Sequence, residues 1–179
     1  LSGKCSHTML DQTAQLSTGG RYAPNSDRSF DPAAMNEQLD LLRDKILLLG
    51  GKTEEAVLRA MQALTTRNTE LAKRVREDDE TIDQMELEID QLSIEILASQ
   101  RPTEHDLRLV VSVAKITPIL ERIADHASSI AETAIILNNA PQIDNYIDFT
   151  LMADIASGML SEALNAFTSE DSAASRQII

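Results

Sequence analysis

The sequence is poor in aromatic residues and in cysteine. Aromatic residues make up 3% of the 179 positions, which is typical of helices packed by Leu, Ile, Val and Ala and unlike a β-sandwich. The single cysteine, Cys5, excludes a disulfide framework and a cysteine-based metal site. No apolar run is long enough to cross a membrane, since the densest one, residues 46–49, ends at two glycines.

Basic residues are also scarce relative to acidic ones. Lys and Arg number 16 against 29 Asp and Glu, which gives a formal net charge of −13. This balance argues against a nucleic-acid partner, because phosphates would be repelled. Cations and basic protein surfaces are the expected partners instead. Because the start of the sequence also lacks the apolar core of a signal peptide, we expect a cytoplasmic protein.

The apolar pattern predicts three long helices and the start of a fourth. Residues 1–30 show no periodicity, so we expect them to form a disordered leader. Matched helix lengths and turns of two or three residues make neighbouring helices antiparallel. The fold expected for residues 31–140 is therefore all-α, an antiparallel three-helix bundle. Its helical stripes lie at about residues 31–67, 69–100 and 103–138.

Several residues within these stripes carry local structural information. Thr69 and Thr103 are expected to cap the second and third helices. Gly50 and Gly51 each cost on the order of 1 kcal/mol relative to Ala inside a helix. Because the pattern continues on both sides of them, we expect another helix backbone to approach closely there. Pro118 is expected to kink the third helix.

The end of the sequence partly repeats its beginning. A shift of 103 residues superimposes Ala60-Met61 on Ala163-Leu164, and residues 63–65 on residues 166–168. Residues 141–179 are thus expected to form the first helix and the start of the second helix of a second, incomplete bundle. The apolar side that this truncation exposes predicts that a neighbouring chain covers it, as in a homo-oligomer.

Acidic residues recur at helical spacing on the second and third predicted helices. Asp79, Asp83 and Glu86 fall within roughly 60° of one another, and Glu121 and Asp125 are about 40° apart. Like charges at this spacing repel each other. One interpretation is the solvated outer face of a bundle. The other is cation binding, because oxygen ligands from two neighbouring helices suit Fe, Mn, Mg or Zn.

Other patterns argue against catalysis. No Glu-x-x-His occurs, so a ferritin-type di-iron core would lack its histidines. His105-Asp-Leu-Arg108 resembles the phosphoacceptor box of sensor histidine kinases, but Leu109 and Val110 stand where Thr-Pro should follow. A carboxylate-bridged hydrolase would need an enclosed pocket, which an outward face does not offer. We expect a protein that is not an enzyme.

Six short segments occur in order along the chain: Leu49-Gly-Gly51, Leu71-Ala-Lys-Arg-Val75, Asp79-x-x-x-Asp83, Arg101-Pro102, Asp106-Leu-Arg-Leu109 and Leu120-Glu-Arg-Ile-Ala-Asp125. Together they resemble the PhoU family of bacterial and archaeal phosphate-uptake regulators. The likeness covers about residues 36–179 and implies two similar three-helix bundles, one complete and one begun. It also implies surface metal clusters on paired Glu/Asp-x-x-x-Asp motifs. The sequence departs from the family at Ala124, where glycine is usual, and at Pro118, where a small helix former is usual. The metal ligands implied are Asp79, Asp83, Glu86, Glu121 and Asp125.

The resemblance also implies a function. It predicts a negative regulator of phosphate transport and phosphate-starvation signalling that contacts the ATPase subunit of the phosphate ABC transporter and a phosphate-sensing membrane histidine kinase. Such a protein would be a cytoplasmic homodimer, peripheral at the inner membrane through its partners, with Fe, Zn, Mn or Mg bound. The alternative is a metal-free structural adaptor whose acidic face docks a basic partner.

Overall fold

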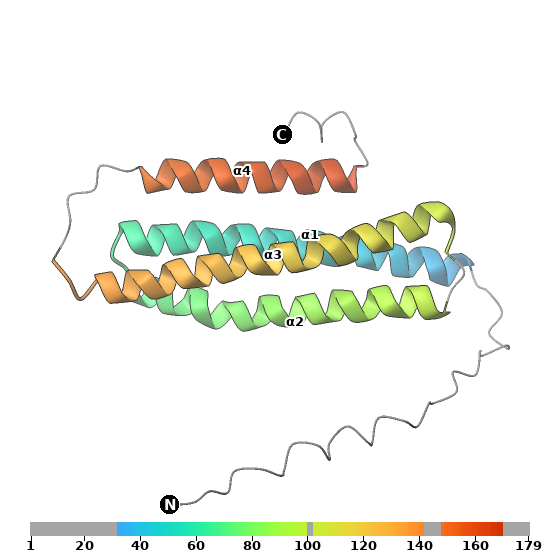
Figure 1. Cartoon of the computed structure of the whole chain (residues 1–179), viewed down its shortest axis with the longest axis horizontal. Coiled ribbons are helices and arrows are strands. Elements are labelled where there is room, and N and C mark those ends of the chain that lie inside the picture. The colour runs from blue at the N-terminus through green and yellow to red at the C-terminus, as the bar shows by residue number, and fades with distance from the viewer. Residues whose placement is uncertain (1–31, 100–101, 142–147, 170–179) are drawn as a thin grey trace, which may run out of the picture.

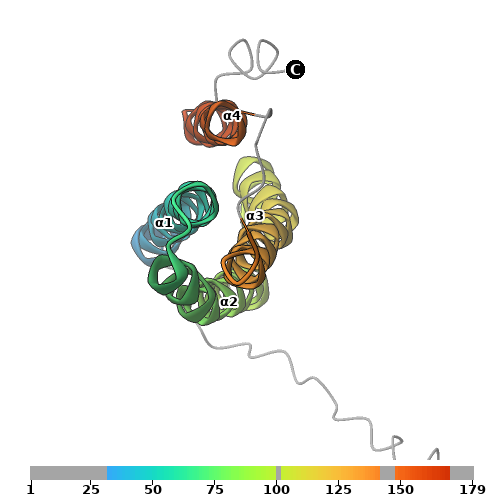
Figure 2. The same cartoon turned by 90° about the vertical axis from the view of Figure 1, so that its left-hand side faces the viewer.

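Four α-helices make up the part of the chain that the computed structural model describes, residues 32–99, 102–141 and 148–169 (Figure 1). No strand occurs among these residues. The first three helices pack against one another around a common core, and the predicted antiparallel three-helix bundle is confirmed. The fourth helix packs on the outside against the first, as the end view shows (Figure 2). The helices are α1 (Pro32–Thr65), α2 (Thr69–Ser99), α3 (Glu104–Leu137) and α4 (Phe149–Thr168).

The core consists of a branched-aliphatic part and an alanine-rich part. Alanine side chains are small, so helices packed through them can approach more closely than helices packed through leucine. The aliphatic part is centred on Leu42, Ile46, Leu49, Ile89, Ile96, Val110, Val113 and Leu120. The alanine-rich part contains Ala60, Ala63, Ala72, Val75, Ala127, Ala131 and Ala134, toward the α1–α2 turn. The expected apolar stripes supply most of the aliphatic part, but of the alanine-rich part they included only Val75 and Ala134.

Two caps begin α2 and α3. At α3 the prediction is correct, because the Thr103 side chain accepts a hydrogen bond from the Asp106 N–H and the Asp106 carboxylate accepts one from the Thr103 N–H. At α2 it is wrong. The Asn68 carboxamide oxygen accepts from the Leu71 N–H at 3.0 Å and caps the helix. The Thr69 hydroxyl is engaged elsewhere, since it accepts a hydrogen bond from the Asn138 side chain.

Arg67 joins the α1–α2 turn to the end of α3. Its backbone is left-handed, with φ at 54°, which turns the chain out of α1. Its Nη2 atom lies 3.0, 3.1 and 2.6 Å from the carbonyl oxygens of Leu137, Asn138 and Ala140. Carbonyls at a helix C-terminus have no partner within the helix, so a guanidinium that donates to them holds the helix end in place. The contact limits sliding of α3 along its neighbours.

The glycine pair on α1 faces α4 at only one position. A Cβ added at Gly50 would overlap the Leu164 side chain of α4, whereas a Cβ at Gly51 would meet nothing within 4 Å. A close approach was expected here, but a leucine side chain rather than a helix backbone occupies the space. The α3 helix runs through Pro118 without a break.

The α4 helix is the described part of the segment expected to open a second bundle. It ends at Thr168, the position onto which the shift of 103 residues carries Thr65, the last residue of α1. The assignment to a second bundle stays a prediction, because residues 142–147 and 170–179 lie outside the described ranges. No helix in the described ranges is long and apolar enough to span a membrane. On its outer side α4 exposes Leu151, Met152, Ile155 and Met159.

Candidate functional site

The five predicted metal ligands lie on two helices that pack side by side. Asp79, Asp83 and Glu86 come from α2, and Glu121 and Asp125 come from α3. Asp83 and Asp125 are exposed, whereas the other three are half-buried. Helical spacing alone would place Glu121 on the outer face of α3, far from its apolar stripe. Helical spacing shows which residues share a face of α3, but it does not show that α2 packs over part of that face.

Asp79 stands where the two helices meet. Partial burial raises the pKa of its carboxyl group above the ordinary 3.8, and the negative charges of Asp83 and Asp125 raise that pKa further. A hydrogen bond with the Ser128 side chain of α3 opposes the shift. Sequence reasoning passed over Ser128. The signal that could have found it is its spacing, three residues after Asp125, which places it on the same face of α3.

Glu86 and Glu121 are linked in the same way. Burial raises the pKa of Glu86, followed in effect by the charges of Asp90, Asp83 and Asp125. Burial also raises the pKa of Glu121, followed by Asp125, Glu86 and Asp83. Each shift includes a contribution from the opposite helix, so the carboxylates behave as one electrostatic group. The structure therefore brings together the two rows that the sequence placed on separate helices.

Nothing positive is paired with these groups in the described residues. None of the five forms an ion pair there, although Asp79 senses the charge of Arg76. The described ranges also hold no set of three His, Cys, Asp or Glu side chains already close enough to bind a metal ion together. The donors are the hard oxygens that Mg²⁺, Mn²⁺ and Fe ions prefer. They fit such an ion in charge and donor type, and their side chains would have to converge to bind it.

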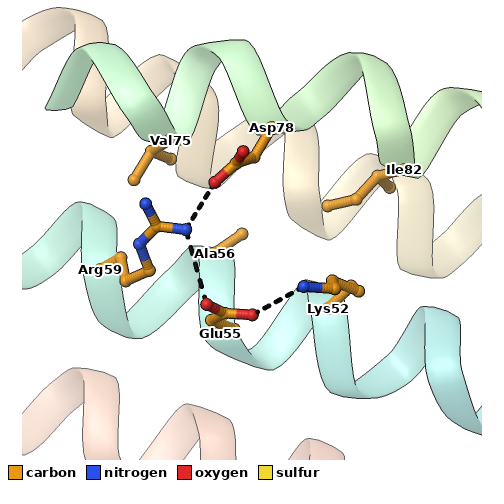
Figure 3. A pocket seen from close by; sticks show the side chains of 7 residues that line it. All are labelled: Lys52, Glu55, Ala56, Arg59, Val75, Asp78 and Ile82. Atoms are coloured by element: carbon orange, nitrogen blue, oxygen red, sulfur yellow. Dashed lines mark hydrogen bonds and ion pairs between the residues drawn. The ribbon is translucent and has the colours of Figure 1, made fainter. Parts of the chain in front are cut away.

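A small pocket between α1 and α2 is a different kind of site (Figure 3). Arg59 lies 2.5 Å from the Asp78 carboxylate and 3.5 Å from that of Glu55, which also binds Lys52 at 3.1 Å. Two cations and two anions thus balance each other, so the pocket has no net charge to attract an ionic ligand. Its lining is completed by Ala56, Val75 and Ile82.

The raised pKa values predict that mild acid stabilises the metal-free protein. The carboxyl groups of Asp79, Glu86 and Glu121 bind protons more readily in the folded chain than at their ordinary values of 3.8 and 4.5. Above those values the folded state holds more protons, so the free energy of unfolding rises as pH falls through the raised pKa values. Urea unfolding with a chelator present should show a higher midpoint at about pH 5.5 than at neutral pH.

Carboxyl groups with lowered pKa values have the opposite effect on the free energy of unfolding. They stabilise the folded chain at neutral pH, and this stabilisation is lost only below about pH 4.5. Such groups include Glu70, Glu88 and Asp106. The double variant Glu86→Gln, Glu121→Gln should therefore show a flatter response between neutral pH and about pH 5.5. A midpoint that falls over this range in the unaltered chain would contradict the electrostatic description of the site.

Comparison with known proteins gives one consistent family. The model of the PhoU domain matches residues 46–134, which include all five carboxylates. The "phosphate-specific transport system accessory protein PhoU homolog" of Aquifex aeolicus is 31% identical over 143 residues, which cover 80% of this chain and 65% of that protein. The chain spans 54% to 58% of the length of curated relatives from Pseudomonas and Zymomonas.

Two crystal structures resemble the model. The structure of PhoU from Pseudomonas aeruginosa aligns with a TM-score of 0.76 at 36% identity and covers 80% of this chain and 69% of that one. The structure of the phosphate transport system regulatory protein PhoU from Streptococcus pneumoniae aligns with a TM-score of 0.71 at 25% identity, over 80% and 68% of the two chains. Both comparisons extend beyond the region that the domain model matches.

Proposed function

The chain belongs to the PhoU family, and from this premise we propose that it is a non-enzymatic regulator of phosphate transport that binds metal ions between α2 and α3. The printed names of its relatives, accessory or regulatory proteins of phosphate transport, support the role. In this proposal the chain acts by contact with the ATPase subunit of a phosphate ABC transporter and with a sensor kinase. A long rigid bundle with an acidic face suits a contact surface.

The observation that carries the metal proposal is the mutual repulsion of carboxylates across two helices. Asp79, Asp83 and Glu86 would hold the ion from α2, and Glu121 and Asp125 would hold it from α3. A bound cation would supply the positive charge that these groups lack and would link the two helices. Their oxygen donors suit Mg, Mn or Fe ions best, with Zn also accommodated.

A second candidate function is that of a metal-free adaptor. It is favoured by the absence, in the described residues, of three acidic or histidine side chains already converged on one point. In that case the carboxylates would meet Lys and Arg side chains of a partner directly. Elemental analysis of the purified chain separates the two, since the adaptor would carry no stoichiometric metal.

The regulatory role can be tested in a bacterial strain that lacks its own PhoU-type protein. A phosphate-starvation reporter in that strain should be active in phosphate-rich medium, and expression of the chain should repress it. The variant Asp83→Asn, Asp125→Asn should repress poorly at equal protein level. The matched control Asp44→Asn, Asp154→Asn changes two exposed carboxylates on α1 and α4 and should repress normally. A reporter that stays fully active when the unaltered chain is expressed would contradict the proposed regulatory role.

A further inference from the structure

Beyond the carboxylates, the same face of α2 and α3 is apolar. Five large hydrophobic side chains are exposed there, to between 39% and 64% of their full area, and we refer to them as the α2–α3 apolar patch. Single exposed hydrophobic residues are ordinary, but a group of them on adjacent helices marks an interaction surface. The patch consists of Leu87, Ile94 and Leu97 on α2 and Leu107 and Val111 on α3.

Helical periodicity aligns this patch with the acidic rows. On α2, Leu97 follows Asp79 by 18 residues, which is five full turns, so the two side chains leave the helix in the same direction. On α3, Leu107 precedes Asp125 by the same interval. Each helix thus carries acidic residues toward one end of this face, which we call the strip, and apolar residues toward the other, although Asp90 lies between Leu87 and Ile94 on α2.

The register between the two helices places both halves of the patch at the same end of the bundle. The Glu86 charge raises the pKa of Glu121 across the groove, so these two positions lie near each other. Because the helices are antiparallel, a step of eleven residues forward along α2 from Glu86 matches a step of eleven residues back along α3 from Glu121. The first step reaches Leu97, and the second reaches the position next to Val111. The two helices pack against each other, but in Figure 1 they diverge toward the end where α2 stops and α3 begins, which is the end that carries the patch.

The strip is not covered by the remaining described helix. The α4 helix contacts α1 and no other described helix, and Figure 2 places it away from α2. From Asp79 to Leu97 the strip is about 27 Å long, because a helix rises about 1.5 Å per residue. It has the length of a peptide helix of about 18 residues.

We propose that this strip docks an amphipathic helix of a partner protein, with the partner's apolar side on the α2–α3 apolar patch and a Lys- or Arg-rich end over the carboxylates. Peptide helices commonly bind by placing apolar residues at helical spacing into such a surface. Charge complementarity then sets the direction of the helix and the rate of association. This inference rests on the regulatory role in the proposed function and names the surface through which the regulator contacts its partner. The basic end of the partner helix and a metal ion would compete for the same carboxylates.

The charges on the strip favour a basic helix over two other occupants. An anionic lipid surface would be repelled by the five carboxylates and by the net charge of −13. A second copy of the chain would bring its own row of carboxylates to the same face, with the exposed Arg76 on α2 and Lys115 and Arg122 on α3 as the nearby cations that could oppose it. A partner with its own Lys or Arg residues meets neither obstacle.

A labelled helical peptide of about 18 residues, with leucines along one side and lysines in its last turns, tests the surface directly. Fluorescence anisotropy with a chelator present would measure its affinity for the unaltered chain and its variants. Ile94→Ser with Leu97→Ser should weaken binding about tenfold or more, as should a peptide with glutamates in place of the lysines. The control Ile119→Ser removes a side chain 55% exposed on the opposite side of α3 from Glu121 and should change affinity less than about twofold.

Several results would overturn the proposal. One is equal peptide affinity in the unaltered chain and the Ile94→Ser, Leu97→Ser variant, with circular dichroism showing both folded. Others are a dimer in sedimentation experiments that this variant converts to monomer, or binding to lipid vesicles that the variant abolishes. In the reporter strain the variant should lose repression. Normal repression by the Ile94→Ser, Leu97→Ser variant would reject the docking surface and leave the proposed function intact. If the unaltered chain binds the peptide as expected but does not repress the reporter, the proposed function alone is rejected.

Discussion

Replacing Asp83 and Asp125 together by asparagine is expected to weaken metal binding by roughly 100-fold or more. The two residues are exposed and come from different helices, so the double variant removes one charged donor from each side of the site. Asparagine keeps the size of the side chain and does not disturb the core. Isothermal titration with Mn²⁺ and Zn²⁺, together with elemental analysis of the purified protein, would measure the loss.

In the absence of metal, the same variant should be more stable toward unfolding than the unaltered chain. Asp83 and Asp125 both raise the pKa values of Asp79 and Glu86 by repulsion, so their removal lowers the electrostatic cost of folding. In the unaltered chain, metal at 100 times its dissociation constant should stabilise the fold by about 2.7 kcal/mol. Melting with and without chelator should thus differ in the unaltered chain and coincide in the variant.

The control for both measurements is Asp44→Asn with Asp154→Asn, which removes the same charge from exposed positions outside the site. It should bind metal as the unaltered chain does. Unchanged metal stoichiometry in the Asp83→Asn, Asp125→Asn variant would contradict the ligand assignment. An unaltered chain that purifies without metal and melts identically with chelator would identify the metal-free adaptor instead.

Leucine at Gly50 is expected to detach α4 from α1. Even a single Cβ at this buried position would overlap the Leu164 side chain, and a leucine adds three further carbon atoms to the same space. Overpacking of this kind costs about 1–3 kcal/mol. Because Leu164 and Phe167 bury against the core from α4, their displacement should leave α4 exposed to exchange and proteolysis. Hydrogen exchange over residues 149–168 would report this directly.

The neighbouring glycine provides a matched control. Alanine at Gly51 would meet no atom within 4 Å, so it should stabilise α1 by about 1 kcal/mol through its better helix propensity. The α1–α3 bundle should stay folded in both variants, with the carboxylates still in place. A Gly50→Leu protein with melting temperature and α4 protection equal to those of Gly51→Ala would show that α4 does not pack where the structure places it.

Much of the site could be predicted from sequence spacing. Asp79 and Asp83, or Glu121 and Asp125, share a face because backbone hydrogen bonds hold the rotation per residue nearly constant along a helix. The N-cap at Thr103 was predictable for a similar local reason. The cap of α2 was not, because Asn68 and Thr69 are both good capping residues and the contact of Thr69 with Asn138 comes from a distant part of the chain.

The sequence by itself determined the helices, their apolar stripes and the spacing of the acidic residues, because these depend on local backbone geometry and on the period of the chain. Only the tertiary structure decided which residues meet across helices. The alanine-rich packing and the contact of Arg67 with the end of α3 set the rotation and axial position of one helix against the next. Those two quantities depend on side-chain packing, and they bring Asp79 to Ser128 and Gly50 to Leu164.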